Sequence, residues 1–444
     1  MPTTSPSPSG RTYVLALLTL LSAVTFMDRQ ILAVLLQPIK HEFGFSDLQI
    51  GLITGLGFAL AFGVLGLPLG RLADRYERRS LIAWCRGVGG CIAATAALAG
   101  GVGLLTASRA GAALGDAGGG AASMSMLSDL YAPHERSRVM SLFGVGSSIG
   151  ALMALVIGPW LAQQWGWRVT LATIGLAAVV GAVLLRWSVR EPVRQHLQAG
   201  APAPASPAVG RSAIALIWAE PVTRWLIVGG AFTLIAGMSL GAWNTALMVR
   251  RYDFSLQQAG WVSAMAALMA VTGSLCSGWL ADKLAQRDVR WQVGVPVLGV
   301  ACAAVFALTY LLLDNDWVWL SLACMWIYSF FSPWWAAPTY AALSLVVPST
   351  RRATASAMLL MAGALLGNGL GPILCGWFSD VLHPLTGGQG LRYAMLLMVC
   401  MLLPGLWAFV QALGHYPRAY RLAQPATPVP VVPAETVGTA KAMG

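Results

Sequence analysis

The sequence predicts an all-α protein that crosses a membrane many times, on the evidence of its composition, its apolar segments and an internal repeat. Of its 444 residues, 57% are hydrophobic and 10% are charged, whereas soluble globular domains carry about 25% charged residues. Twelve apolar segments approach the roughly 20 residues that a helix needs to cross a bilayer core. The low charge excludes a soluble domain, and the apolar content excludes a disordered chain.

The apolar segments follow one another with short polar breaks and one long break. The expected helices lie at residues 13–36, 48–70, 80–101, 103–128, 139–162, 168–187, 224–249, 257–280, 292–313, 317–344, 354–378 and 391–413. The long break, 188–222, is rich in Pro and Ala, which is typical of a flexible linker. It separates two expected six-helix bundles at 13–187 and 223–414. Polar residues 1–12 and the Pro-rich residues 415–444 are expected to form cytoplasmic tails, the second of them disordered.

The positions of the basic residues predict the orientation in the membrane. If the N-terminus is cytoplasmic, 21 Lys and Arg residues, including Arg78, Arg79 and Arg86, lie on the cytoplasmic side and 5 lie on the other. Cytoplasmic loops of membrane proteins are enriched in Lys and Arg, so we expect both termini inside the cell, in the inner (plasma) membrane. This asymmetry accounts for the net charge of +11 without a nucleic-acid partner.

The two halves of the chain carry the same motifs at corresponding places. The run Gly66-Leu-Pro-Leu-Gly70-Arg-Leu-Ala-Asp74-Arg75 follows the second segment, and the related run 274–283, which contains Gly278, Asp282 and Lys283, follows the eighth. A Gly-Pro pair occurs at 158–159 in the fifth segment and at 371–372 in the eleventh. Parallel repeats of this kind build many secondary transporters, so we expect two pseudo-symmetric bundles.

These loops resemble those of the major facilitator superfamily, and other stretches are similar to spinster-like members of the bacterial type. The similarity covers most of residues 12–413. The stretches that carry it are GLPLGRLADRYERR, GWLADKL, TFMDRQILAVLLQPIKHEFGFSDLQIGLITG, SRAGAALGDAGG, SGWLADKLAQRDVRWQVGVP and GNGLGPILCGWFSDVL. The resemblance implies the major facilitator fold, alternating access and a lysophospholipid or sphingoid substrate. The chain departs from the spinster-like pattern at Asp116, where that pattern has the longer glutamate.

Four charged residues, Asp28, Arg29, Arg109 and Asp116, lie well inside predicted helices. Each costs roughly 2.5–3.5 kcal/mol at the bilayer centre on insertion scales, and intramembrane charges usually serve function. Arg109 and Asp116 are two helical turns apart and share a face. We expect a compensated cluster for proton coupling, with Asp28 and Asp116 as the proton carriers; the alternative is a static ion network. The resemblance also implies proton coupling and gating at these positions.

The repeated loop is expected to act as a gate. Gly66 and Gly70 are spaced for close helix contact. In the superfamily, the loop Asp and its arginines latch the cytoplasmic ends of the two halves together, and the resemblance carries this role to Asp74, Arg75 and Arg79, and to Asp282 and Lys283 in the copy. The alternative is that these basic residues only set the topology.

The C-terminal half offers few polar groups within its predicted helices. The candidates for a substrate cavity there are Trp243, Asn244, Trp334, Trp335, Tyr340 and Asn368. A cavity that is charged on one side and apolar on the other fits an amphiphile better than a sugar. The alternative is that the aromatic side chains only pack.

The sequence therefore predicts a monomeric secondary transporter, proton-coupled, for an amphipathic lipid-like substrate. The alternative is a proton-coupled symporter or exporter of a small organic anion or drug, with Arg29 and Arg109 holding a carboxylate. The scattered Cys and His residues predict no metal site, and no phosphate-binding GxxxxGK[ST] loop is present. We expect no cofactor and no enzymatic activity; a membrane enzyme or a receptor is the weaker hypothesis.

Overall fold

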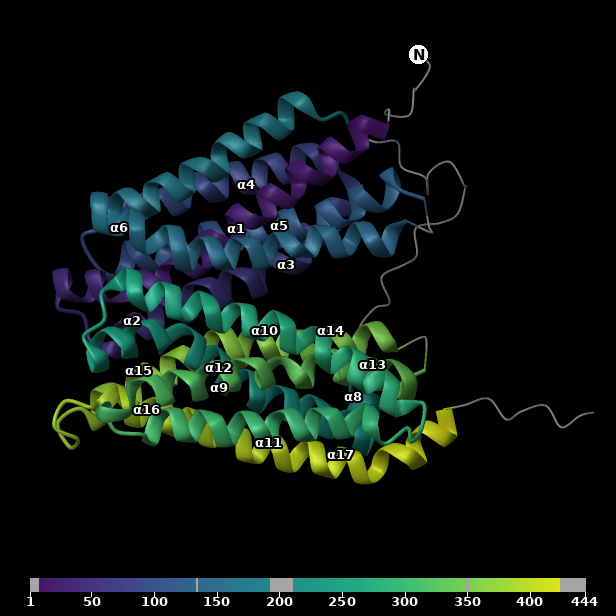
Figure 1. Ribbon diagram of the computed structural model, residues 1–444. Coiled ribbons are helices and arrows are strands. Elements are labelled where there is room, and N and C mark those ends of the chain that lie inside the picture. Colours follow the sequence, from purple (N-terminus) through teal and green to yellow (C-terminus); the bar gives the residue numbers. More distant parts are fainter. Residues whose placement is uncertain (1–7, 133–134, 192–210, 349–350, 424–444) are drawn as a thin grey trace, which may run out of the picture.

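The computed structural model describes residues 8–132, 135–191, 211–348 and 351–423, and all the regular structure in these ranges is helical. The helices form two bundles that lie one above the other in Figure 1, with α1 to α6 in one and α9 to α17 in the other. The prediction of two helical bundles is confirmed.

The N-terminal bundle contains six membrane-length rods. Two rods contain a short 3-10 or π-helical segment, and the positive φ of Gly166 (79°) divides α6 into two helices. The elements are α1 (Pro8–Phe43), α2 (Asp47–Gly51) with η1 (Leu52–Leu56) and α3 (Gly57–Arg75), α4 (Arg78–Ala94) with η2 (Thr95–Leu98), α5 (Val102–Leu130) and α6 (Arg136–Ser188).

The C-terminal bundle repeats this arrangement after a short helix, α8 (Arg211–Ala219). Its rods are α9 (Pro221–Tyr252), α10 (Leu256–Ala285), α11 (Trp291–Leu312), η3 (Asn315–Trp317) with α12 (Val318–Phe331), η4 (Ser332–Trp335) and α13 (Ala336–Val346), α14 (Arg352–Ala362) with η5 (Gly363–Leu370) and α15 (Gly371–Leu382), and α16 (Gly390–Cys400) with α17 (Leu402–Ala423).

Length and hydropathy alone identify nine candidate spans among the described residues. One of them, Arg138–Ser188, is two helices joined at Gly166. The rod α5, which carries Arg109 and Asp116, and the rod α12–α13, which the 3-10 turn η4 interrupts, complete the twelve helices.

The helix ends correct the predicted tails and linker. α1 begins at Pro8, α8 lies inside the predicted linker 188–222, and α17 continues to Ala423, beyond the predicted start of the C-terminal tail at 415. Apolar composition marks only the part of a helix that is inside the bilayer, so polar turns that extend a helix escape it. Residues 192–210 and 424–444, which hold the rest of the linker and of the tail, lie outside the described residues.

The internal repeat extends to the turns between the first two helices of each bundle. Gly44 and Asp253 both have positive φ (67° and 53°). Ser46 and Ser255 then begin the next helix with a capping box, in which the serine accepts from the backbone N–H of Gln49 or Gln258 and the glutamine side chain accepts from the serine N–H. The same turn therefore aims α2 and α10 in the two halves.

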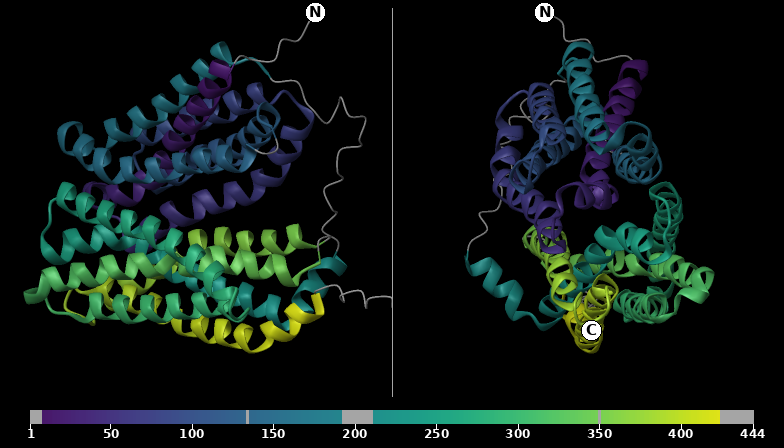
Figure 2. Two further views of the ribbon diagram at one scale, coloured as in Figure 1. Left: turned by 45° about the vertical axis from the view of Figure 1, so that its right-hand side comes forward. Right: turned by 90° about the vertical axis from the view of Figure 1, so that its left-hand side faces the viewer.

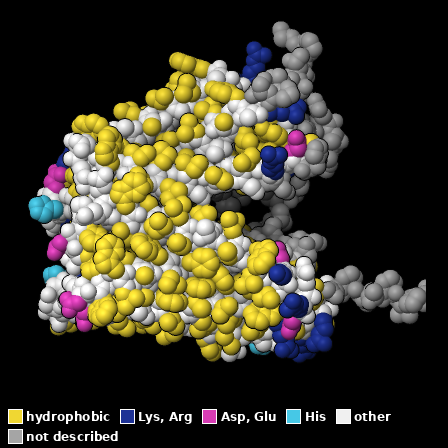
Figure 3. Space-filling view, viewed as in Figure 1, with side chains coloured by type: hydrophobic (Ala, Val, Ile, Leu, Met, Phe, Trp, Pro, Cys, Tyr) yellow, Lys and Arg dark blue, Asp and Glu magenta, His cyan; other side chains and the backbone are white. Residues whose placement is uncertain are grey.

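The halves meet at one end of the molecule and separate at the other. We call the end where α1 and α9 begin the linker end, and the end where they finish the far end. Contacts between the halves join α2, η1 and the start of α3 to α15 and η5, and join α6 to α10. Figure 2 shows the two bundles diverging toward the linker end, and Figure 3 shows the surface hollowed between them there.

Arg78 holds the linker end of the N-terminal bundle together. Its side chain is 2% exposed; Nη1 lies 2.6 Å from Asp129 of α5, and Nε lies 3.0 Å from Glu191 beyond α6. Nη1 also donates to the backbone and hydroxyl oxygens of Ser125 at 3.1 Å. The sequence assigned Arg78 to the cytoplasmic side as one of the arginines that set the topology, but did not predict its buried ion pairs, because the partners come from distant parts of the chain.

Replacing Arg78 by Met should destabilise the protein strongly, because removing one partner of a buried ion pair leaves its carboxylates uncompensated. The expected loss is about 3–5 kcal/mol of unfolding free energy, measured by thermal unfolding of purified protein. Arg138→Met is the control, because Arg138 is an exposed arginine in the same bundle. Equal unfolding temperatures of the two variants would contradict a structural role for Arg78.

Candidate functional site

The four charged residues predicted inside the membrane lie together between α1 and α5. Nη2 of Arg109 lies 3.6 Å from Oδ1 of Asp28, and its Nη1 donates to the backbone oxygen of Asp28 at 3.0 Å. Nη1 of Arg29 lies 3.4 Å from Oδ2 of Asp116. Each helix therefore supplies one acid and one base, and the pairs cross from helix to helix.

The two pairs differ in burial. The side chains of Asp28 and Arg109 are 7% and 3% exposed, whereas those of Arg29 and Asp116 are 23% and 33% exposed. The guanidinium of Arg29 also stacks over the ring of Phe58, 4.4 Å from its centroid, a favourable cation–π contact. One pair is thus enclosed by protein, and the other is within reach of a ligand.

A cavity of about 100 Å³ lies beside this cluster, between the two halves. Its wall joins cationic and aromatic side chains of the N-terminal bundle to mostly apolar residues of the C-terminal bundle. The lining residues that define this contrast are Arg29, Arg109 and Phe58 on one side and Met238, Asn368 and Pro372 on the other. Both π-helical segments reach it, through Thr54 of η1 and Asn368 of η5, and π-helical turns are frequent at functional sites.

Arg86 is a fifth charged residue of this region, which the sequence placed in the cytoplasmic rim. It lies in α4 with 2% of its surface exposed. The acid that interacts with it electrostatically is Asp116. Its Nε and Nη1 atoms are buried and have no hydrogen-bond partner among the described residues. The sequence does contain a sign of this burial. Arg86 follows Arg78 by about two helical turns and so falls inside the third apolar segment, 80–101.

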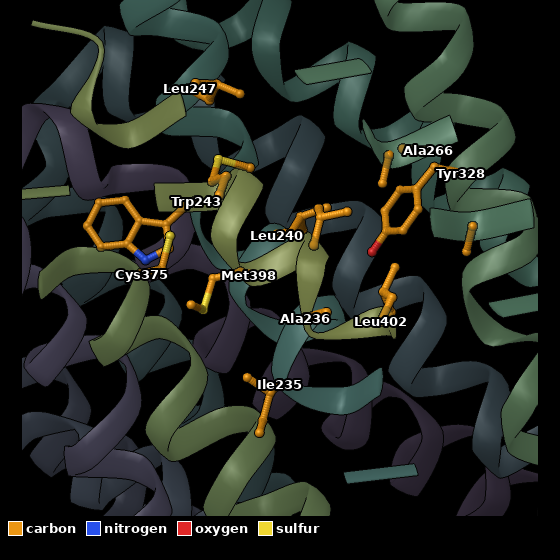
Figure 4. Packing of buried hydrophobic residues seen from close by; sticks show 14 of the residues in the cluster. Ile235, Ala236, Leu240, Trp243, Leu247, Ala266, Tyr328, Cys375, Met398 and Leu402 are labelled. Carbon is orange, nitrogen blue, oxygen red and sulfur yellow. The ribbon is translucent and has the colours of Figure 1, made fainter. Parts of the chain in front are cut away.

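Most of the predicted cavity residues of the C-terminal half lie in its packed interior. Trp243 is fully buried and donates from its indole to the backbone oxygen of Pro372 at 3.1 Å; Figure 4 shows its ring beside Cys375. Asn244 accepts from the hydroxyl of Tyr310 at 2.7 Å. Both side chains therefore bond within their own bundle.

The other aromatic candidates do not line the cavity either. Trp334 is 6% exposed and packs against Phe330 and Phe331, and Trp335 is 7% exposed within the main core. Tyr340 is partly buried against the same core. Of the six candidates, Asn368 lines the cavity. The other five pack inside the C-terminal bundle.

The described side chains of the predicted latch contact residues of their own halves. Among the described residues, a Cβ atom at Gly66 would meet nothing within 4 Å, so Gly66 makes no close helix contact with them. Arg79 pairs with Glu77 at 2.5 Å and donates to the backbone oxygen of Val189, both in its own half. The exposed Lys283 stacks on Trp279, next to the exposed Asp282.

The remaining latch residues, Gly70, Asp74 and Arg75, lie outside the part of the molecule whose side chains are described. Their predicted role stays a prediction.

The far end carries an ionic network that sequence reasoning missed. Asp47, 4% exposed, accepts two hydrogen bonds from Arg250 of the C-terminal bundle, at 2.7 and 2.8 Å. It also accepts from Ser379 at 2.6 Å and pairs with Lys40. Asp380 accepts from the backbone N–H groups of residues 47 and 48 at 2.8 and 2.7 Å, so a carboxylate from one half caps a helix of the other.

Close backbone contacts reinforce this end. A Cβ atom at Gly51 would lie 2.6 Å from the backbone oxygen of Pro372, and Gly55 and Gly376 approach backbone atoms of the opposite half as closely. Glycine allows such helix contacts because it has no side chain. The far end is therefore closed by charge and by packing, whereas the linker end is open.

The architecture, the internal repeat and the charged cluster of the N-terminal bundle beside the cavity define a major facilitator transporter. The Major Facilitator Superfamily model matches residues 18–358, and the chain belongs to this family. The resemblance to this superfamily and to spinster-like proteins is confirmed by the relatives below.

An MFS-type efflux pump of Mycolicibacterium smegmatis is 32% identical over 407 residues, which cover 90% of this chain and 92% of the relative. Human protein spinster homolog 1 is 27% identical over 452 residues, which cover 93% of this chain and 80% of the relative. A solved structure of a bacterial homolog of the human lysosomal transporter Spinster, inward-facing and occupied, has a TM-score of 0.82 at 24% identity and covers 96% of this chain and all of its own. That structure shows the shared fold.

Replacing Asp47 by Asn should open the far end. The change removes the charge that Arg250 binds, and losing one partner of a buried, hydrogen-bonded charge pair costs about 2–5 kcal/mol. We expect the distance between spin labels at His41 and Leu385, measured by electron paramagnetic resonance, to shift toward a longer population.

The matched control is Glu42→Gln, because Glu42 lies at the same end but pairs with Arg168 of its own half. An Asp47→Asn distance distribution that matches both the parent and this control would show that the network does not hold the far end closed.

Proposed function

We propose that this transporter moves an amphipathic, lipid-like substrate by alternating access and couples the movement to protons. The observation that carries the proposal is the cavity between the halves, where Arg29 and Arg109 face an apolar wall. A lysophospholipid or a sphingoid lipid has one polar head and one apolar chain, which suits such a two-sided wall. The resemblance of the sequence to spinster-like proteins, which implies this substrate class, is the second ground for the proposal.

The charged cluster supplies the chemistry for proton coupling. Asp28 is buried in the membrane-spanning part of α1, and its ion pair with Arg109 is long, at 3.6 Å. A buried carboxylate whose arginine partner turns to a substrate loses its compensating charge, and binding a proton restores neutrality. Asp116, which pairs with Arg29 at the cavity, is the second proposed carrier.

The proposed orientation follows the basic residues. We place the linker end in the cytoplasm of a cell with the protein in its inner membrane, because that end carries most of the Lys and Arg residues. The hollow between the halves then faces the cytoplasm, and the closed far end faces outward. We propose that the monomer is the working unit, because the cavity lies between the two halves of one chain.

The second candidate function is export or symport of a small organic anion or drug. The observation that favours it is the pair of arginines at the cavity, since guanidinium groups bind carboxylates with directed hydrogen bonds. The name of the mycobacterial relative, an efflux pump, favours export as the direction.

Neutralising either carboxylate should uncouple transport from the pH gradient. In proteoliposomes loaded with a fluorescent lysophospholipid, an imposed pH gradient should drive transport by the parent, whereas Asp28→Asn and Asp116→Asn should exchange the lipid without responding to the gradient. Asp316→Asn, which changes an exposed acid outside the cluster and the predicted latch, should behave as the parent. Retention of the full gradient response in both cluster variants would refute coupling through these acids.

Binding of a suitable probe should stabilise the purified protein through Arg29. A ligand at a hundred times its Kd raises the unfolding free energy by about 2.7 kcal/mol. We expect this shift with lysophosphatidylglycerol and its loss in Arg29→Gln, but not in Arg290→Gln, which alters an exposed arginine. Stabilisation by gluconate in place of the lipid would favour the organic-anion function.

A further inference from the structure

The charged groups in the middle of α1, α4 and α5, apart from the Arg78 network at the linker end, do not balance. The described part of this region holds three guanidinium groups, those of Arg29, Arg86 and Arg109, and two carboxylates, those of Asp28 and Asp116. Asp28 pairs with Arg109 and Asp116 pairs with Arg29, so Arg86 is the cation in excess. A buried arginine without an acceptor is costly in the interior of a protein.

Arg86 is buried between α4 and α5. It is 2% exposed, and its Nε and Nη1 atoms have no hydrogen-bond partner among the described residues. The guanidinium lies against α5. A Cβ atom at Gly119 would be 2.5 Å from Nε of Arg86, and a Cβ atom at Gly115 would be 3.9 Å from Cα of Arg86. The missing side chain of Gly119 therefore leaves the room that the arginine occupies.

Asp116 lies on the part of α5 that Arg86 covers. Residues three apart in a helix are neighbours on its surface, so Asp116 adjoins the position of Gly119. It is the acid that acts on Arg86 electrostatically, and its own bond to Arg29 is a single one, 3.4 Å long. The two side chains therefore lie at the same part of α5, and each can change its rotamer.

We propose that Arg86 is the alternative partner of Asp116: the ionised carboxylate exchanges between Arg29, which lines the cavity, and Arg86, which is buried against α5. In the first arrangement Arg29 is neutralised. In the second, Arg29 remains stacked on Phe58 with a free guanidinium for an anionic group of a ligand. Protonation of Asp116 releases it from both. Arg86 is thus a positioning residue, and only its role in transport rests on the proposed function.

The exchange is tested without a substrate, by thermal unfolding of the purified full-length protein and its variants. Arg29→Gln removes the first partner of Asp116, so the carboxylate should then bind Arg86. We expect Arg86→Gln to lower Tm by at least about 2 °C more in the Arg29→Gln background than in the parent. This difference should disappear when Asp116→Asn is also present, and Arg86→Lys should restore most of the lost Tm in the Arg29→Gln background.

The same change of Tm on Arg86→Gln in both backgrounds would overturn the exchange, because it would make Arg86 a fixed packing or ion-pair residue. If Arg86→Gln does not fold, Asp116→Asn in the Arg29→Gln background gives the answer: a lower Tm supports a pair with Arg86, and an equal or higher Tm overturns it. Asp129→Asn is the control, because Asp129 pairs with Arg78 and its effect should not depend on Arg29 or Arg86. A protein that passes this test and transports no lipid would refute the proposed function alone.

Discussion

The high cost of an uncompensated charge away from water shapes this molecule at every level. It leaves most basic residues near the ends of the helices and confines the charges within the membrane to one place in the N-terminal bundle. There, each acid of α1 or α5 lies beside a guanidinium of the other helix, so the cluster holds these two helices together as it compensates itself. The same cost makes Arg86 informative, because its buried Nε and Nη1 find no acceptor among the described residues, which is why we propose a second arrangement in which Asp116 is its partner.

The two bundles differ in how they contact each other at the two ends of the molecule. At the far end, Asp47 and Asp380 reach across to donors of the opposite half, and glycines bring the backbones together. At the linker end, the described basic residues pair within their own bundle, as Arg78 and Arg79 do. The cavity lies between a closed and an open end, which is the arrangement that a transporter needs if access is to alternate.

The fold follows from the sequence because hydropathy and repeated motifs are local signals. The same is true of Asp28, Arg29, Arg109 and Asp116, since a charge inside an apolar run is visible without coordinates. The network of Asp47 was not predictable in this way, because Arg250 and Ser379 lie 203 and 332 residues away in the chain, in the opposite bundle. Trp243 and Asn244 show a second limit of prediction from sequence. When a helix is buried on several sides, the sequence does not reveal which face a polar or aromatic residue occupies, and these two side chains lie on the face inside their own bundle.

The repeated turn at Ser46 and Ser255 marks the place where the symmetry of the two halves ends. The two copies share the positive φ and the capping box, but Asp47 in the first corresponds to Leu256 in the second. The carboxylate that binds Arg250 therefore has no counterpart in the second copy. The far end is symmetric in its helices and asymmetric in its charges, so its closure depends on one aspartate and not on a matched pair.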